Sequence, residues 1–217
     1  MEAAFSKNIA MIFEQPTSIF ALVAMVALIL AFAYIKKVKL NTSMMVHIGL
    51  MLALTVILHT FRLYHMPQGG SVTLGAMIPL LLIAFRYGPA VGYLSGFTYG
   101  LLNLLQDPYI LHPVQVLFDY PLPYMALGLA GYFKERMLLG AIVGICGRFI
   151  CHFISGVVFF ASYAPAGTSP YWYSLVFNAI YLLPELMICL LMLRVLPVKR
   201  LLLQMRNSEN YVSGYGR

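Results

Sequence analysis

Three polar side chains that could bind a charged or hydrogen-bonding ligand lie inside otherwise apolar stretches of the sequence. They are the carboxylate of Asp119, the imidazole of His152 and the carboxamide of Asn178. Each by itself is compatible with a structural role, because a polar side chain on one helix is often satisfied by its neighbour. Combined with nearby aromatic rings, one anion and two hydrogen-bonding groups are typical of a pocket for a small aromatic cation.

Helical spacing places further residues beside two of these side chains. Gln115 precedes Asp119 by four residues and therefore lies one turn away on the same helix face. His152, Gly156 and Phe160 follow at the same interval and share one continuous face. Gly156 would let a flat group or another backbone approach closely, although it could equally be an ordinary helix-packing glycine. Both faces are candidates for the walls of a pocket.

Aromatic residues open the last apolar stretch. Tyr171, Trp172 and Tyr173 are consecutive, and Asn178 follows about one to two helical turns later. For Tyr171 and Trp172 the favoured interpretation is an aromatic belt at a membrane surface. Asn178 lies too deep for such a belt, which keeps it a candidate for the pocket.

The composition indicates which elements must position these side chains. Of the 217 residues, 61% are hydrophobic and only 10% are charged, whereas a typical soluble domain has about 25% charged residues. An ordinary soluble domain and a disordered chain are therefore excluded. A membrane span needs about 20 residues, so the apolar stretches leave no room for a soluble catalytic or nucleotide-binding domain. We expect seven spans, at 18–34, 44–64, 72–85, 89–105, 115–133, 138–160 and 171–196. The third is short, and we expect either a helix that continues from an ordered loop or one tucked between its neighbours.

The positive charges predict the orientation of these spans. If residues 36–39 face the cytoplasm and the spans alternate, eleven Lys and Arg residues fall on the inner side, and only Lys7 and Arg62 fall on the outer side. Cytoplasmic loops carry such an excess, so the net charge of +7 reflects topology rather than nucleic-acid binding. We expect the N-terminus outside, the C-terminus in the cytoplasm, and a first span that is retained rather than cleaved.

This orientation places Asp119, His152 and Asn178 together in the outer half of the membrane. Because the three side chains share one depth, a single pocket that contains all of them is a simpler interpretation than a separate structural role for each. The outer loops expected above them are 67–71, 106–112 and 162–170, the last of which could be an ordered lid.

Two more charged residues, Arg148 and Glu185, are expected near mid-membrane below this cluster. A lone buried charge would be expensive there. We therefore predict that they pair with each other or with helix carbonyls, next to a kink at Pro184.

Four motifs occur in an order that matches one transporter family. They are Pro67-Gln-Gly-Gly-Ser-Val72, His112-Pro-Val-Gln-Val-Leu-Phe-Asp-Tyr120, His152-Phe-Ile-Ser-Gly156 and Tyr173-Ser-Leu-Val-Phe-Asn178. In these motifs the chain resembles the thiamine-specific S component of energy-coupling factor (ECF) transporters, the ThiT (YuaJ) family. The resemblance implies an all-α polytopic protein of the bacterial cell membrane. Its six-helix substrate-binding core would span 43–200, between an N-terminal extension with an extra transmembrane helix (1–42) and a cytoplasmic tail (201–217).

The resemblance also implies a function and partners. The protein would capture thiamine at the outer face and dock on one transmembrane coupling subunit and two ATPases, without being an enzyme or needing a cofactor or metal. The family's acidic and polar positions would hold the aminopyrimidine and hydroxyethyl groups of thiamine, and aromatic rings would stack on its two heterocycles. These positions fall on Asp119, Tyr120, His152, Gly156, Phe160, Tyr173 and Asn178, with Gln115 and Trp172 as further candidates.

Three residues depart from the family pattern. Asp119 stands where some members have Glu, which shortens the reach of the carboxylate by one methylene. Phe160 stands where some members have Trp, a better surface for a cation. Gly70 matches a loop position that is Trp in some members, so Trp172 is a candidate to supply the missing stacking. The substrate class is expected to survive these changes, and the affinity is left open.

The first core helix carries a candidate docking surface. Gly49 and Ala53 have small-xxx-small spacing, which permits close contact between helices. S components dock through small residues on this helix, so the resemblance implies that Gly49 and Ala53 contact the coupling subunit. The alternative is ordinary packing within the chain.

Other classes of function are weighed against this one. The chain has no GxxxxGK[ST] motif, so energy must come from a partner or an ion gradient. A stand-alone transporter coupled to protons through Asp119, Glu185 or a histidine is the main alternative, although no inverted repeat supports it. An S component for another heterocyclic vitamin is a second alternative. An intramembrane enzyme is disfavoured because Ser155, near His152, lacks a GxSxG context and no HExxH motif is present. The three cysteines show no disulfide or zinc-site spacing.

Overall fold

The computed structural model describes residues 26, 28–30, 33–35 and 38–215. The expected first span, 18–34, lies largely outside these residues. The described elements are α3 (Thr42–Thr60), β1 (Arg62–His65), β2 (Ser71–Thr73), α4 (Ile78–Tyr87), α5 (Pro89–Gln106), α6 (Pro113–Asp119), α7 (Pro121–Ala126), the 3-10 helix η1 (Leu127–Phe133), α8 (Met137–Phe159), the 3-10 helix η2 (Ala161–Tyr163), α9 (Pro170–Val195) and α10 (Val198–Tyr215).

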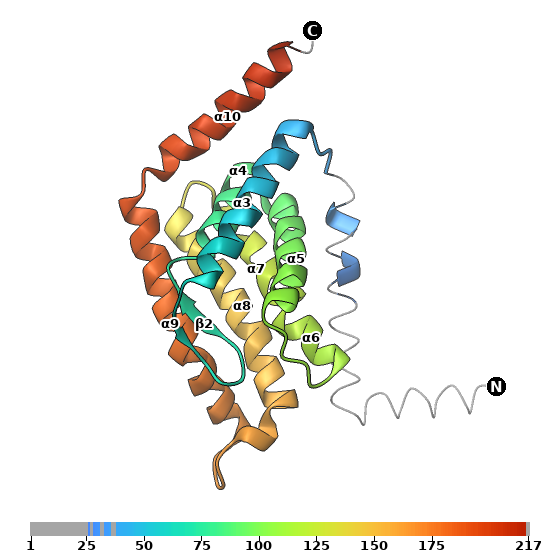
Figure 1. Cartoon of the computed structure of the whole chain (residues 1–217), viewed down its shortest axis with the longest axis vertical. Helices are drawn as coiled ribbons and strands as arrows, with labels where there is room; N and C mark the ends of the chain where they lie inside the picture. Colours follow the sequence, from blue (N-terminus) through green and yellow to red (C-terminus); the bar gives the residue numbers. More distant parts are fainter. Residues whose placement is uncertain (1–25, 27, 31–32, 36–37, 216–217) are drawn as a thin grey trace, which may run out of the picture.

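The helices form a bundle in which α8 packs on α9 and on the α7–η1 segment, while α5 packs on α4, α7 and η1 (Figure 1). Helices α3, α8 and α9 are long and apolar enough to cross a membrane. The tip of the β1–β2 hairpin, α6 and the α8–α9 connection lie toward the end opposite α10. The all-α polytopic membrane fold predicted from the sequence is confirmed, with a two-stranded antiparallel hairpin added to it.

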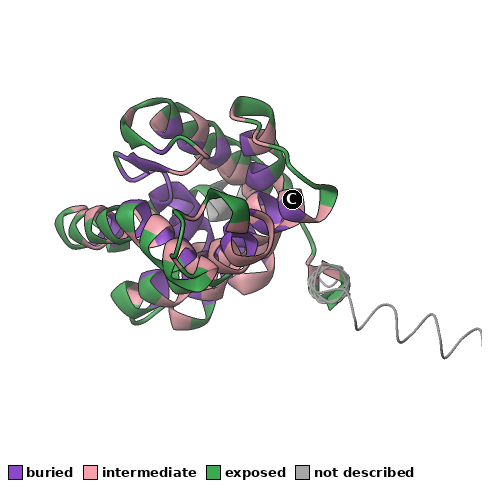
Figure 2. Ribbon diagram, turned by 90° about the horizontal axis from the view of Figure 1, so that it is seen from below, coloured by how far each residue is buried: buried purple, intermediate pink, exposed green. Residues whose placement is uncertain are grey.

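Helix α4 forms the centre of the apolar core. Every residue from Ile78 to Phe85 is buried, and buried residues gather toward the inside of the bundle (Figure 2). A helix that is apolar on all sides has to be enclosed by other helices or by lipid. This short span is therefore tucked between its neighbours, one of the two arrangements expected for it, and it also follows the ordered hairpin.

Three of the predicted span boundaries are wrong. The spans 44–64 and 72–85 were expected to be helical throughout, but Arg62–His65 and Ser71–Thr73 pair as an antiparallel hairpin. The span 115–133 is divided into α6, α7 and η1. Pro121 follows the break after α6 and lacks the amide hydrogen needed to continue a helix. Apolar composition alone does not reveal such a break.

A row of glycines on α5 lets this helix lie directly on the broken segment. Gly92, Gly96 and Gly100 follow at four-residue intervals and share one face. A Cβ atom at Gly92 would lie 2.7 Å from the Cα of Gly128, and one at Gly100 would lie 2.6 Å from the Cα of Pro121. A Cβ at Gly96 would collide with the carbonyl oxygen of Tyr124. Side chains cannot be accommodated here, so the glycines determine the spacing of α5 and α7.

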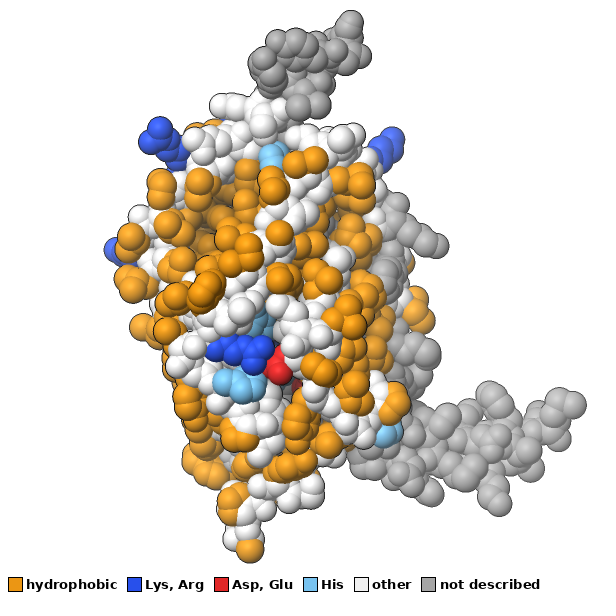
Figure 3. Space-filling model, in the orientation of Figure 1, with side chains coloured by type: hydrophobic (Ala, Val, Ile, Leu, Met, Phe, Trp, Pro, Cys, Tyr) orange, Lys and Arg blue, Asp and Glu red, His pale blue; other side chains and the backbone are white. Residues whose placement is uncertain are grey.

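The outer surface of the bundle is mainly apolar. In Figure 3 hydrophobic side chains cover most of the visible face, and Lys and Arg side chains concentrate near the end where α10 lies. Exposed residues such as Leu50, Leu105, Leu191 and Val195 contribute to this surface. Such a surface is suited to lipid rather than to water.

The glycine row yields a prediction about stability. Replacing Gly96 with Ala should destabilise the protein by about 1–3 kcal/mol, because the added methyl group collides with the Tyr124 backbone. A thermal melt of the purified protein in detergent should show a lower Tm. Gly49→Ala is the matched control, since nothing lies within 4 Å of a Cβ at that position. Equal Tm values for the two variants would contradict the proposed close packing.

Candidate substrate-binding cavity

An open cavity with about 730 Å³ of empty space lies between the hairpin, α6, α8 and α9. Side chains and backbone from six helices, two loops and the hairpin turn line it. The lining residues are His59, Gln68, Gly69, Gly70, Ser71, Asn103, Asp107, Tyr109, Gln115, Asp119, Tyr120, Tyr124, Arg148, His152, Gly156, Phe160, Tyr173, Ser174, Phe177, Asn178 and Tyr181.

Asp119 is positioned by the short helix α6 that it ends. His112 caps this helix by accepting a hydrogen bond from the backbone of Val114 at 3.1 Å. Gln115, which is buried, accepts from the Leu111 amide at 2.9 Å and donates to Asp119 Oδ2 at 2.5 Å. A carboxylate in an apolar bundle needs such donors. The expected adjacency of Gln115 and Asp119 is therefore present, and Gln115 also ties α6 to the preceding loop.

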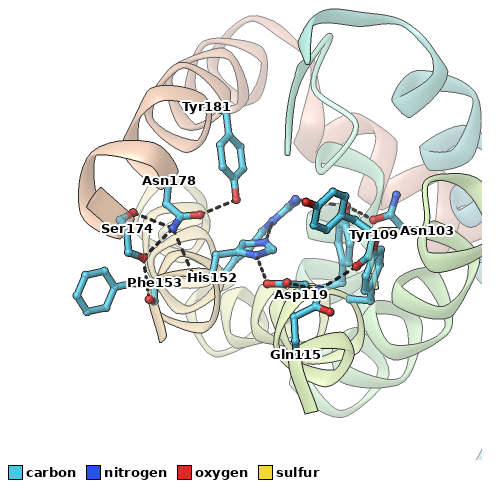
Figure 4. A network of polar contacts seen from close by, with 12 residues as sticks. Asn103, Tyr109, Gln115, Asp119, His152, Phe153, Ser174, Asn178 and Tyr181 are labelled. Carbon is cyan, nitrogen blue, oxygen red and sulfur yellow. Dashed lines mark hydrogen bonds and ion pairs between the residues drawn. The ribbon is translucent and has the colours of Figure 1, made fainter. Parts of the chain in front are cut away.

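His152 of α8 faces Asp119 from the opposite wall. Its Nδ1 lies 3.3 Å from Asp119 Oδ1 (Figure 4). On α9, the Asn178 amide donates to the carbonyl oxygens of His152, at 3.3 Å, and of Ser174, at 2.8 Å. Tyr181 in turn donates its hydroxyl hydrogen to Asn178 Oδ1 at 2.9 Å. Asp119, His152 and Asn178, which were expected at the same depth in the membrane, thus all line one cavity.

Gly156 lets α8 and α9 approach each other beside this network. A Cβ atom at Gly156 would collide with Ser174 Oγ, which donates to the Phe153 carbonyl at 2.8 Å. The residue lines the cavity, but the contact that requires glycine here is helix packing. The packing interpretation and the pocket interpretation of this glycine therefore coexist.

Aromatic rings form another part of the wall. Phe160 stacks on Tyr109 with ring centroids 5.8 Å apart, and the Tyr109 and Tyr163 hydroxyls lie 2.8 Å apart. This hydrogen bond raises the pKa of Tyr109 above its ordinary value. The Tyr120 hydroxyl accepts from the Tyr109 amide and donates to the Asp107 carbonyl, so Tyr120 holds the 107–112 loop against α6. Tyr173 lines the cavity from α9.

Trp172 is not brought to the cavity. Its side chain is 62% exposed and is absent from the lining residues. It lies on α9 beside Tyr171, which is 64% exposed, as expected for an aromatic belt at a membrane surface. The structure therefore gives no support to Trp172 as a replacement for the loop tryptophan of other family members.

The floor of the cavity is a buried polar chain. The Arg148 guanidinium lies over the Tyr124 ring, 4.3 Å from its centroid, and donates to the Tyr124 hydroxyl at 3.3 Å. That hydroxyl donates to Asn103 Oδ1 at 3.1 Å, and the Asn103 amide lies 3.2 Å from His59 Nδ1. These side chains connect α8, α7, α5 and α3 beneath Asp119.

The prediction that Arg148 and Glu185 pair with each other or with helix carbonyls is wrong. Among the described residues, no ion pair joins them. Glu185 instead accepts hydrogen bonds from the backbone N–H of Thr73, at 2.5 Å, and from its hydroxyl, at 2.6 Å. The reason is the unforeseen strand β2, which brings two donors to this buried carboxylate. Arg148 is satisfied by Tyr124 and His152.

An ion pair between Arg62 and Asp107 lies at the mouth of the cavity. Arg62 of β1 contacts Asp107, which follows α5, at 2.9 Å. His65 lies 3.1 Å from the Arg62 guanidinium and 2.9 Å from the Ser71 hydroxyl. This partly buried cluster and the buried Thr73–Glu185 contact together fix the hairpin at the edge of the cavity.

Sequence reasoning missed several lining residues. Asn103 and His59 are polar residues in apolar stretches, the same signal that identified Asn178, and could have been found by it. Tyr109 and Tyr181 had no such signal, because tyrosines are frequent in this chain. Asp107 could not be placed without knowledge of the hairpin that supplies its partner Arg62.

The cavity is suited to binding rather than to hydrolysis. The carboxyl group of Asp119 contacts Gln115 and His152 and faces a cavity with aromatic walls. Ser155, the candidate nucleophile, is buried, has no hydrogen-bond partner and does not line the cavity. Within the described part of the chain, no cluster of His, Cys, Asp or Glu could hold a metal ion.

The fold and the cavity define a helical membrane protein with a cavity lined by polar and aromatic side chains. A family model described as thiamine transporter protein (Thia_YuaJ) matches residues 45–205. The chain therefore belongs to this family, and its role is transport rather than catalysis. The family resemblance recognised from the four sequence motifs is confirmed.

Individual relatives agree with this assignment. The chain is 36% identical over 168 residues to the thiamine transporter ThiT of Bacillus subtilis (strain 168), covering 69% of this chain and 87% of that protein. It is 31% identical over 122 residues to ThiT of Lacticaseibacillus paracasei, covering 47% and 61% of the two chains. A solved structure of ThiT from Listeria monocytogenes superposes with a TM-score of 0.63 at 22% identity, over 77% of this chain and 95% of that one. This last likeness shows a shared fold.

The buried contact of the hairpin yields a second prediction. Replacing Glu185 with Ala leaves the Thr73 N–H and hydroxyl without their acceptor, at a cost of about 1–3 kcal/mol. The hairpin should then open more often. Hydrogen exchange followed by mass spectrometry should show faster exchange at the amides of Ser71–Thr73 than in the unmodified protein.

The control for this experiment is Glu135→Ala, which removes an exposed carboxylate between η1 and α8. It should leave exchange in the hairpin unchanged. If both variants exchange at the rate of the unmodified protein, Glu185 does not hold strand β2.

Proposed function

We propose that this protein is the thiamine-binding S component of an ECF-type transporter. The observation that carries the proposal is the carboxylate of Asp119 in an aromatic-walled cavity, found in a chain that belongs to a family of thiamine transporters. Thiamine is a cation with two aromatic rings. An anion and π faces are the groups that attract such a ligand.

The proposed contacts with thiamine are of two kinds, polar and aromatic. Asp119, Gln115, His152 and Asn178 would serve the charge and the polar groups of thiamine. Tyr120, Phe160 and Tyr173 would supply aromatic surface, and Gly156 would admit a ring close to the α8 backbone. Tyr109 joins this proposal because it stacks on Phe160 and lines the cavity.

Two alternatives are distinguished by different observations. A stand-alone proton-coupled thiamine transporter would take up thiamine in cells that lack the ATPase module, and uncouplers would stop it. An S component for another heterocyclic vitamin would bind that vitamin in preference to thiamine. Glu185, one of the carboxylates considered for proton coupling, is engaged by Thr73, which favours a structural role for it.

Binding of thiamine by the purified chain tests the proposal. Calorimetric titration in detergent should give submicromolar affinity, and Asp119→Asn should weaken it by about a hundredfold, which corresponds to about 3 kcal/mol. The reason is that the amide keeps the shape of the carboxylate while removing its charge. Glu135→Gln makes the same chemical change at an exposed site and should leave the affinity unchanged. Unmodified protein that ignores thiamine would contradict the proposal.

We further propose that the coupling subunit docks on α3 at Gly49 and Ala53. Both residues are exposed, and nothing lies within 4 Å of a Cβ at Gly49, so packing within the described chain does not explain these small residues. They lie on the apolar surface of a candidate membrane span. A flat patch of small residues allows a partner helix to approach closely.

The proposed topology follows the distribution of charge. The hairpin tip and α6, which contribute to the cavity wall, lie toward the end of the bundle opposite α10, and most of the Lys and Arg side chains visible in Figure 3 lie in the half toward α10. With the positively charged end in the cytoplasm, the cavity opens outward and the C-terminus is inside. The proposed domains are the binding core at 43–200, the extension at 1–42 and the cytoplasmic tail at 201–217, which includes most of α10.

Substitutions on α3 should separate docking from binding. Gly49→Leu combined with Ala53→Leu should reduce ATP-dependent thiamine uptake by cells at least about tenfold, because the bulk blocks a close helix contact. Thiamine binding by the purified variant should remain intact, since neither residue lines the cavity. Leu54→Met, at an exposed position on a different face of the same helix, should change neither property. Normal uptake by the double variant would place the docking surface elsewhere.

A further inference from the structure

Both ring nitrogens of His152 are engaged by charged neighbours. Arg148 Nε lies 3.3 Å from His152 Nε2 and donates to it, and Asp119 Oδ1 lies 3.3 Å from His152 Nδ1. A guanidinium group has only donors, and an ionised carboxylate has only acceptors. His152 Nε2 must therefore accept, and His152 Nδ1 must carry the hydrogen that is donated to Asp119.

Arg148 cannot easily turn away from this contact. Its side chain is buried, lies over the Tyr124 ring and donates to the Tyr124 hydroxyl. Tyr124 is itself fixed by its hydrogen bond to Asn103. The donor at Nε is thus held in place by two other helices, α7 and α5.

The remaining groups around the imidazole do not replace this donor. The Tyr181 ring of α9 lies edge-on, with its centroid 6.1 Å away, and its hydroxyl donates to Asn178. The Asn178 amide contacts the backbone carbonyl of His152 rather than its ring. The thiol of Cys151 is the neighbouring ionisable group on α8. Asp119 of α6 is the acid that faces the ring, and Arg148 is the base.

We propose that Arg148 is a positioning residue that holds His152 as the singly protonated Nδ1–H tautomer, so that Asp119 keeps its negative charge for a cationic ligand. A second proton would put an N–H at Nε2 against the N–H of Arg148, which is unfavourable. Without the Arg148 N–H facing Nε2, His152 would take up a second proton. The imidazolium ion beside Asp119 would then cancel the negative charge that attracts the ligand. This role rests on the proposed binding of thiamine.

The proposal has a consequence for binding near neutral pH. An unperturbed imidazole has a pKa of about 6.5 and changes its charge in this range. With Arg148 present, His152 does not take up its second proton, and affinity for a cation stays constant between pH 8 and pH 6. With Arg148 removed, protons and the cationic ligand compete for the same carboxylate.

Nitrogen-15 NMR of histidine-labelled protein tests the tautomer directly, without any ligand. The chain has five histidines, and the His152 signals are assigned by comparison with His152→Gln. We expect a protonated Nδ1 and an unprotonated Nε2 from pH 6 to pH 8. In Arg148→Met the ring should gain a second proton at pH 6, whereas Arg148→Lys, which keeps a cationic donor, should restore the original spectrum.

Thiamine titrations at pH 8 and pH 6 supply the second readout. Arg148→Met should bind roughly fourfold more weakly at pH 6 than at pH 8, the change expected when an ordinary imidazole has to lose its proton before binding. The unmodified protein and Arg148→Lys should show no such difference. Arg194→Met removes an exposed arginine of α9 and should also give a flat profile.

Two results would overturn the proposal. One is an Nε2–H or doubly protonated His152 in the unmodified protein at pH 7, which needs no variant that might misfold. The other is an Arg148→Met variant with the spectrum and pH profile of the unmodified protein. An Nδ1–H tautomer in a protein that ignores thiamine would contradict the proposed function instead and leave the role of Arg148 in place.

Discussion

A carboxylate held inside an apolar bundle is the constraint around which this structure is arranged. The two carboxyl oxygens of Asp119 are met there by Gln115, which donates to one of them, and by His152 Nδ1, which lies 3.3 Å from the other. Each donor is fixed in turn, Gln115 by the loop before α6 and His152 by Arg148. The chain of hydrogen bonds continues through Tyr124 and Asn103 to His59, so that α3, α5, α6, α7 and α8 all contribute to one network.

This network requires helices that approach closely and end at the right places. The α5 glycines remove side chains where α5 meets α7, which brings Asn103 within reach of Tyr124. The break after Asp119 separates α6 from α7 and places Asp119 and Tyr124 on different segments. The hairpin then closes one side of the cavity, with Glu185 holding Thr73. Binding geometry and helix packing therefore depend on the same few positions.

The sequence predicted the class of fold and part of the cavity wall. Hydrophobicity identified the spans, and the cost of polar groups in a membrane identified Asp119, His152 and Asn178. It could not predict the hairpin, because Leu63 and Val72 are also compatible with an apolar helix. It therefore could not predict the contacts that Asp107 and Glu185 make with the hairpin. Trp172 was a candidate by residue type, but its position on the outer side of α9 follows only from packing.

The most direct test of the central claim is an experimental structure of the protein with thiamine bound. The account predicts thiamine inside the cavity between α6, α8 and the hairpin, with Asp119 and His152 in contact with it and Phe160 beside a ring. Thiamine bound at another place, or a cavity in which Asp119 turns away from the ligand, would contradict it.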